Sequence, residues 1–192
     1  MEMAFAYLKD RGIDVIVFRE PGGVAISEKI RDLLLDVRHA EMSHECETLL
    51  YMAARSQLVV EILVPTLKKG THILCDRFLD STVVYQGYGN GVDIEFIKRL
   101  GNFVTHGVRP ELTLLFDIDA KEGLSRIKRS KDRIERRAVA YHNRVRQGYL
   151  KLAESEPGRI KVIDSGKRSK DEIFAEVKGH MDAFFGLRAL TP

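Results

Sequence analysis

Cysteine, tryptophan and long apolar runs are scarce in this chain of 192 residues. It has no tryptophan, and its two cysteines, Cys46 and Cys75, form no paired metal-binding motif. We therefore expect both to be reduced structural thiols, which favours a cytoplasmic location over an oxidising compartment. No run approaches the 18 apolar residues of a membrane-spanning helix, and the start shows no basic-then-apolar signal peptide. We expect no membrane partner.

Motifs that are missing disfavour several further classes of function. The six histidines show no metal-ligand spacing, and the HExxH pattern of zinc peptidases does not occur. Ser81 lacks the Gly-x-Ser-x-Gly context of a serine hydrolase. A net charge of +3 is too small to indicate nucleic-acid binding by itself, so we expect no nucleic-acid partner.

The order of apolar and amphipathic segments predicts an α/β fold with a parallel sheet. A single domain over residues 1–187 with a tail at 188–192 fits this pattern. Ser43 is the predicted cap of the helix that follows it. Predicted strands cover 14–18, 72–75, 112–117 and 160–164, and predicted helices cover 1–12, 25–35, 45–68, 93–105, 119–129, 133–153 and 170–185.

The most informative segment follows the second predicted strand. Residues 76–87 read DRFLDSTVVYQG. At the carboxyl end of a buried strand, Asp76 offers a carboxylate for magnesium and Arg77 offers a guanidinium for phosphate. An Asp-Arg pair alone occurs often by chance, but the Ser-Thr and Tyr-Gln-Gly that follow make the segment specific.

This segment resembles the Asp-Arg signature of bacterial thymidylate kinases, which transfer a phosphoryl group from ATP to dTMP. Three further segments resemble the same family in the same order, and together the matches cover roughly residues 1–185. They are the turn FREPGG at 18–23, the base-stacking helix ETLLYMAAR at 47–55, and the lid with the helix behind it, DRIE at 132–135 and YHNRVRQGYL at 141–150.

The resemblance implies a P-loop NTPase-like parallel sheet flanked by helices, and a cytosolic homodimer that uses ATP and Mg²⁺. It implies that three arginines hold the acceptor phosphate, that Thr82 and Gln86 read thymine, and that Tyr85 crowds the sugar. Tyr51 and Arg55 are four residues apart and share a helix face, so one can stack on a base while the other reaches its phosphate. The implied dTMP site comprises Arg19, Glu20, Pro21, Arg31, Tyr51, Arg55, Arg77, Thr82, Tyr85 and Gln86.

The implied catalytic groups are Asp76 on magnesium, Arg77, and Arg133 in a lid at about 126–137. Arg133 would also contact ATP, together with Lys167 and Arg168 after the last strand. Simpler interpretations stay open at this stage. The ring of Tyr51 suits a core, segment 80–86 suits a capped helix start, and the seven basic residues between 126 and 137 suit a solvated helix face or a polyanion-binding patch.

The family's phosphate loop, G-x-x-x-x-G-K-S/T, does not occur in the sequence. The nearest string ends in Gly166, Lys167 and Arg168, with the wrong spacing and no hydroxyl. The first predicted helix has no capping residue before it. We therefore expect about two dozen upstream residues, holding a central first strand and this loop, to be missing from the chain. The alternatives are a catalytically inactive dTMP-binding remnant and a kinase for another nucleoside monophosphate.

Overall fold

Short runs rich in Val, Ile and Leu form the strands of the computed structural model, which describes residues 1–187. The tail predicted at 188–192 lies outside this range. The strands are parallel and hydrogen-bonded in two pairs, with Val15 opposite His72 and Thr113 opposite Ile160 at their starts. Within the described residues no ladder joins β2 to β3. The strands are β1 (Val15–Arg19), β2 (His72–Asp76), β3 (Thr113–Asp117) and β4 (Ile160–Asp164).

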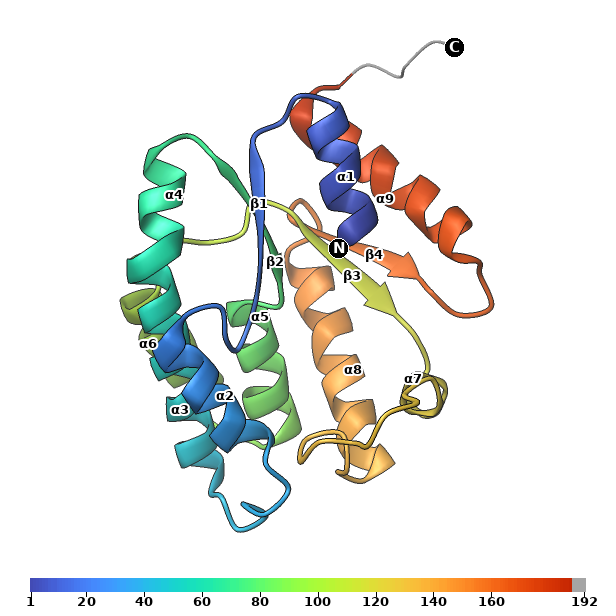
Figure 1. The fold of residues 1–192 in the computed structure, drawn as a ribbon. Helices are drawn as coiled ribbons and strands as arrows, with labels where there is room; N and C mark the ends of the chain where they lie inside the picture. The colour runs from blue at the N-terminus through green and yellow to red at the C-terminus, as the bar shows by residue number, and fades with distance from the viewer. Residues whose placement is uncertain (188–192) are drawn as a thin grey trace.

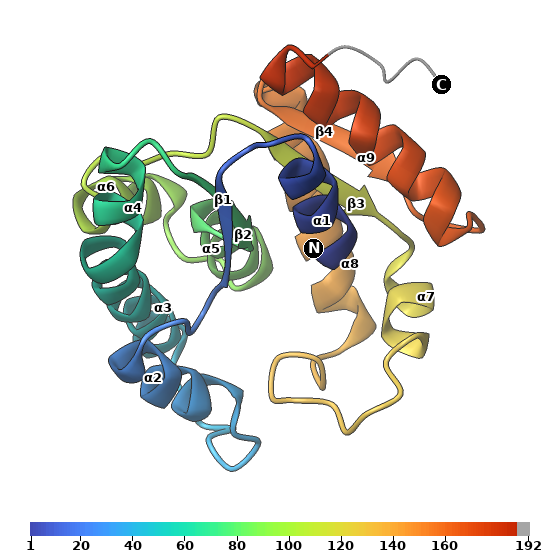
Figure 2. The ribbon, with the colours of Figure 1, turned by 45° about the horizontal axis from the view of Figure 1, so that its top comes forward.

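Two helices cover one face of the strands (Figure 1). They are α1 (Glu2–Asp10) and α9 (Lys170–Phe185), which lie side by side in Figures 1 and 2. The two helices pack on the strands through an apolar cluster that includes side chains from both strand pairs. Side chains alternate between the two faces of a strand, so each strand can present apolar side chains to this cluster. Its buried members are Leu8, Val15, Ile163, Val177 and Met181.

The opposite face is covered by longer helical segments. Over β1 and β2 lie α3 (His44–Leu58), the π-helical η1 (Val59–Leu63) and α4 (Val64–Lys68), while α8 (Val139–Ser155) lies over β3 and β4. Between them run α5 (Leu79–Thr82) and the π-helical η2 (Val83–Gly89). The remaining helices are α2 (Ala25–Leu35), α6 (Ile94–Val104) and α7 (Ala120–Ser125). The predicted α/β class with parallel strands between helices is confirmed.

The helix predicted at 45–68 is one continuous segment with a π-helical insert that the sequence pattern did not predict. The insert directly precedes α4, whose first turn contains Pro65. Proline has no N–H to donate and crowds the preceding turn, so a locally widened helix accommodates it. His44–Lys68 is also long and apolar enough to cross a membrane by composition alone, a test that core helices pass as well. Here it packs on α2 and α6.

Two helix boundaries were predicted wrongly, and both adjoin the loop between α7 and α8. The helix predicted at 119–129 ends at Ser125, and the helix predicted from 133 begins at Val139. Asp132 explains the second error, because its Oδ1 accepts the backbone N–H of Ile134 and Glu135, each at 2.9 Å, and holds a turn. The interpretation of the basic run as a helix face is therefore wrong, since it forms a loop.

The predicted cap of α3 is confirmed. The Ser43 hydroxyl accepts the backbone N–H of Cys46 at 3.1 Å and caps the helix. Cys46 and Cys75 are both free thiols. Helix α1 begins at Glu2 without a side-chain cap, as its sequence indicates.

Candidate nucleotide-binding site

A narrow pocket lies where β1 and β2 end, between α3 and the α5–η2 segment. The carboxyl ends of the two strands meet there, with Arg19 paired opposite Asp76. The cavity volume of this pocket in the structure is about 10 Å³. Seven of the ten residues predicted for the dTMP site line it, together with Ser81. The full lining is Glu20, Pro21, Tyr51, Arg55, Arg77, Ser81, Thr82 and Gln86.

A buried ion pair forms the floor of this pocket. Arg55 Nη2 lies 2.7 Å from Glu20 Oε2, and Arg55 Nη1 donates to Thr82 Oγ1 at 3.0 Å. Both charged side chains are almost fully buried. Burial raises the pKa of Glu20, and the positive charge of Arg55 opposes that shift. Glu20 Oε1 has no hydrogen-bond partner in the part of the chain that the structure describes, so it remains free to accept one from a ligand.

Arg77 supplies a second cation at the pocket. Its backbone has φ 72°, a left-handed conformation that is uncommon for residues other than glycine. The guanidinium carbon lies 4.3 Å from the ring centre of Tyr85, within the range of a cation–π contact. Among residues 1–187, Arg77 forms no ion pair with a carboxylate, unlike Arg55. Its charge is therefore available to an anion.

Tyr51 supplies an aromatic wall one helical turn before Arg55. Its side chain is 8% exposed, and burial raises the pKa of its hydroxyl, which keeps the ring neutral. The predicted i,i+4 arrangement is thus present, with ring and guanidinium both lining the pocket.

The remaining predicted residues lie outside the pocket lining. Arg19 is half exposed and pairs with Glu28 at 3.2 Å. Arg31 donates to the Pro21 carbonyl at 2.8 Å, and burial followed by repulsion from Arg19 lowers its pKa. Arg31 is therefore next to the pocket rim, whereas the Arg19 guanidinium is bound by a carboxylate.

Asp76 is exposed at the end of β2. No group of three or more His, Cys, Asp or Glu side chains that could hold a metal ion occurs in residues 1–187. A magnesium ion at Asp76 would therefore take most of its ligands from water and substrate. The two residues predicted to contact ATP lie in the loop after β4. Of these, Arg168 is bound to Glu176 at 2.6 Å and to the Asp164 carbonyl at 3.0 Å, and Lys167 precedes it in the same loop.

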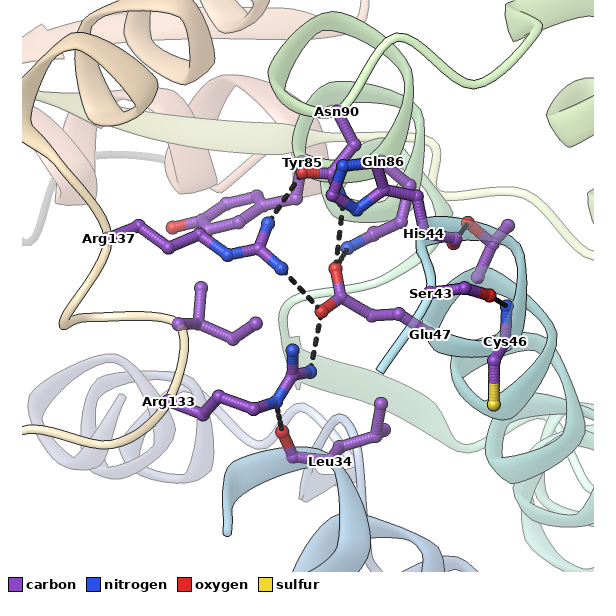
Figure 3. Close-up of polar contacts among 12 residues, drawn as sticks. Leu34, Ser43, His44, Cys46, Glu47, Tyr85, Gln86, Asn90, Arg133 and Arg137 are labelled. Atoms are coloured by element: carbon purple, nitrogen blue, oxygen red, sulfur yellow. Dashed lines mark hydrogen bonds and ion pairs between the residues drawn. The ribbon is translucent and has the colours of Figure 1, made fainter. Parts of the chain in front are cut away.

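The basic run is largely paired within the molecule. Arg133 donates to Glu47 Oε2 at 2.5 Å and to the Leu34 carbonyl at 2.8 Å, so its guanidinium is buried away from the pocket lining. Arg137 binds the same carboxylate oxygen at 2.7 Å (Figure 3). Because these arginines already contact groups within the molecule, the structure does not support the interpretation of the basic run as a free polyanion-binding patch.

Glu47 is the central residue that the sequence interpretation missed. It precedes Tyr51 by four residues and Arg55 by eight, so the helical period places it on the same face. That spacing was the available signal. Its contacts with Gln86, Asn90, Arg133 and Arg137 come from distant segments and show only in the fold.

Two cations, a buried carboxylate and an aromatic wall at the ends of parallel strands define a nucleotide-binding α/β protein. The family model described as thymidylate kinase matches residues 1–177. The chain is 45% identical over 174 residues to a thymidylate kinase of Geobacillus sp. (strain WCH70), covering 88% of this chain and 82% of that one. The crystal structure of thymidylate kinase from Ehrlichia chaffeensis superposes with a TM-score of 0.74 at 29% identity, covering 94% of this chain and 88% of that one.

The chain therefore belongs to the thymidylate kinase family, and the resemblance seen in its four motifs is confirmed. It is a nucleoside monophosphate kinase by this membership, and phosphorylation of thymidylate is the function that the membership carries.

Proposed function

We propose that the pocket at the ends of β1 and β2 binds dTMP as the phosphoryl acceptor, with ATP as the donor. The observation that carries this proposal is the Arg77 guanidinium, which lines the pocket without a carboxylate partner in the described chain. A phosphate monoester is a dianion near neutral pH and binds arginine through charge-assisted hydrogen bonds. The aromatic wall formed by Tyr51 suits the face of a nucleobase.

The proposed roles follow from these positions. Tyr51 stacks on thymine, and Arg77 holds the acceptor phosphate with Arg55 and Arg31 beside it. Glu20 Oε1 is the acceptor for a sugar hydroxyl or an ordered water. Phosphoryl transfer depends mainly on positioning and on neutralising charge, so these groups supply the acceptor half of the reaction.

The donor half requires groups that the sequence does not contain. We infer that the ATP phosphates are held by a phosphate-binding loop additional to these 192 residues, from the same or another polypeptide. A strand leading into that loop would fit between β2 and β3, which no ladder joins in residues 1–187. Mg²⁺ would be bound by Asp76 through water and by the ATP phosphates, and it would neutralise charge on the transferred group.

Calorimetry separates this proposal from a dTMP-binding remnant. We expect dTMP to bind the 192-residue chain, and Mg·ATP to bind well only when the phosphate-binding loop is supplied. Turnover, followed as ADP formation, should then appear with dTMP present. Tight Mg·ATP binding by the chain alone would contradict the need for an added loop. Failure to turn over with the loop present would favour the remnant.

We also propose that the protein is a homodimer joined through α3, η1 and α6. These elements pack together and expose large apolar side chains. Phe103 is 76% exposed, an unusual state for phenylalanine in a monomer. The other exposed side chains on this surface are Leu49, Val60 and Phe96.

Light scattering tests the dimer. The native chain should have a mass of two copies, and Phe103→Glu should reduce it to one, because a charge in an apolar interface is costly to desolvate. Phe184→Glu, on α9 in the other layer, is the matched control and should leave the mass at two copies. A monomeric native chain would refute the proposal.

A further inference from the structure

Glu47 holds the most heavily bonded carboxylate next to the pocket. Its side chain is fully buried and four donors reach it from two parts of the chain (Figure 3). Oε1 accepts from Gln86 Nε2 and Asn90 Nδ2, each at 2.9 Å. Oε2 accepts from the lid arginines Arg133 and Arg137. Each oxygen of the Glu47 carboxylate therefore contacts two donors, and these four contacts fix the orientation of the carboxylate.

The contact with Glu47 determines how the Gln86 amide is oriented. An ionised carboxylate only accepts hydrogen bonds, so the amide nitrogen must face Glu47 and the amide oxygen must face away. Gln86 lines the pocket and is 1% exposed. Within residues 1–187 no hydrogen bond to Gln86 Oε1 is formed, so an acceptor remains for a ligand. A ligand that covers this acceptor must supply a donor in place of water, or the acceptor is left unpaired, so a ligand with a donor is selected.

The pyrimidine bases differ at the atom that such an acceptor would meet. Thymine and uracil carry a hydrogen on N3, whereas cytosine has a lone pair there. Thr82 adds to the selection, because its Oγ1 accepts from Arg55 and its own proton is left to donate to a base carbonyl. Cytosine has an amino group in place of the 4-carbonyl. A cytosine in this pocket would bring acceptor to acceptor and donor to donor.

We propose that Glu47 is a positioning residue that turns the Gln86 amide oxygen toward the acceptor pocket and thereby selects thymine or uracil over cytosine. This inference rests on the proposed function of the pocket as the acceptor site. The same carboxylate anchors the loop that carries Arg133, so base selection and lid position depend on one buried side chain.

The test is calorimetric binding of dTMP, dUMP and dCMP to the native protein and to Glu47→Gln. The native protein should prefer dTMP and dUMP over dCMP by about 100-fold or more. A glutamine at position 47 can donate as well as accept, so Gln86 is free to turn, and the ratio of dTMP to dCMP affinity should fall at least about tenfold. A purely structural role would weaken all three ligands equally and leave the ratio unchanged, which would overturn the proposal.

Arg137→Gln is the matched control. It removes one lid contact of Glu47 and leaves the contact with Gln86, so the affinity ratio should remain within about twofold of the native value. A ratio that falls as far as in Glu47→Gln would overturn the proposal. If dTMP does not bind the native protein at all, the proposed function fails. If dTMP and dCMP bind equally well, only the assignment of Glu47 fails.

Nuclear magnetic resonance of the native protein tests the orientation of the Gln86 amide, and this test remains available even if Glu47→Gln does not fold. The side-chain amide protons of Gln86 should exchange slowly and keep their resonance positions when dTMP is added, because they point to Glu47. Large shifts of these protons on dTMP binding would mean that the amide nitrogen faces the base, which would overturn the proposal.

Discussion

Replacing Arg55 by alanine will abolish measurable dTMP binding and lower the free energy of unfolding by about 3–5 kcal/mol. Arg55 and Glu20 are almost fully buried and 2.7 Å apart, so the variant leaves a carboxylate in the interior without its counter-charge. Thr82 loses its donor in the same step. Denaturant unfolding and calorimetry with dTMP measure the two effects.

The pH dependence of this variant has a definite sign. Burial raises the pKa of Glu20, and removing Arg55 removes the group that opposes the shift. A carboxyl with a raised folded-state pKa binds a proton more strongly in the folded state, so stability falls as pH rises through that pKa. The loss caused by Arg55→Ala should therefore be smaller at about pH 5 than at about pH 8.

Arg38→Ala is the control for loss of an arginine. Arg38 pairs with Asp36 and its side chain is 84% exposed, so solvent screens the pair and its removal should leave the free energy of unfolding almost unchanged. Equal losses in Arg38→Ala and Arg55→Ala would show that burial of the Arg55–Glu20 pair has no special importance.

The second large effect is expected for Arg77→Gly, which should weaken dTMP binding about 100-fold or more while preserving the fold. Glycine adopts φ 72° without steric cost, whereas other residues lose about 1–2 kcal/mol there. The variant should thus be as stable as the native protein or slightly more stable. Loss of ligand binding could then not be attributed to unfolding.

Thymidine, which lacks the phosphate, is the matched ligand for this variant. If Arg77 binds the phosphate, thymidine should bind the native protein and Arg77→Gly with similar affinity, while only dTMP distinguishes them. A parallel loss of thymidine and dTMP binding would instead indicate that Arg77 supports the shape of the pocket through its contact with Tyr85.

The strands and most helices could be predicted because their signals are local. Apolar runs gave all the strands of the described chain to within two residues, and the predicted ranges for α2 and α9 match the observed helices. The lid boundaries could not be predicted in this way. Arg133 donates its backbone N–H to the Leu35 carbonyl and its side chain to Leu34, about a hundred residues earlier, and these contacts override local helix preference.

The same distinction applies to the site. Residues within one motif, such as Tyr51 and Arg55, were predicted from spacing and are found together in the pocket. Arg19 belongs to a matching motif, yet Glu28 on α2 holds its guanidinium outside the pocket lining. Glu47 on α3 contacts Gln86 on η2 and Arg133 in the loop before α8. These three segments are far apart in the sequence, so no single segment predicts the contacts.

The two strand pairs have a mechanical consequence. In residues 1–187, β1 bonds to β2 and β3 to β4, so the boundary between the pairs can open without breaking any ladder hydrogen bond. Cohesion across it comes from side chains: the apolar cluster beneath α1 and α9, the packing of α8 on η2, and ion pairs such as Arg159–Asp80 and Arg133–Glu47. Close-packed side chains lose roughly a quarter to a half of their attraction when they separate by about 0.5–1 Å. The strand proposed between β2 and β3 would add ladder hydrogen bonds across this boundary, so the boundary should be the first part of the 192-residue chain to open and the part that the added strand stabilises most.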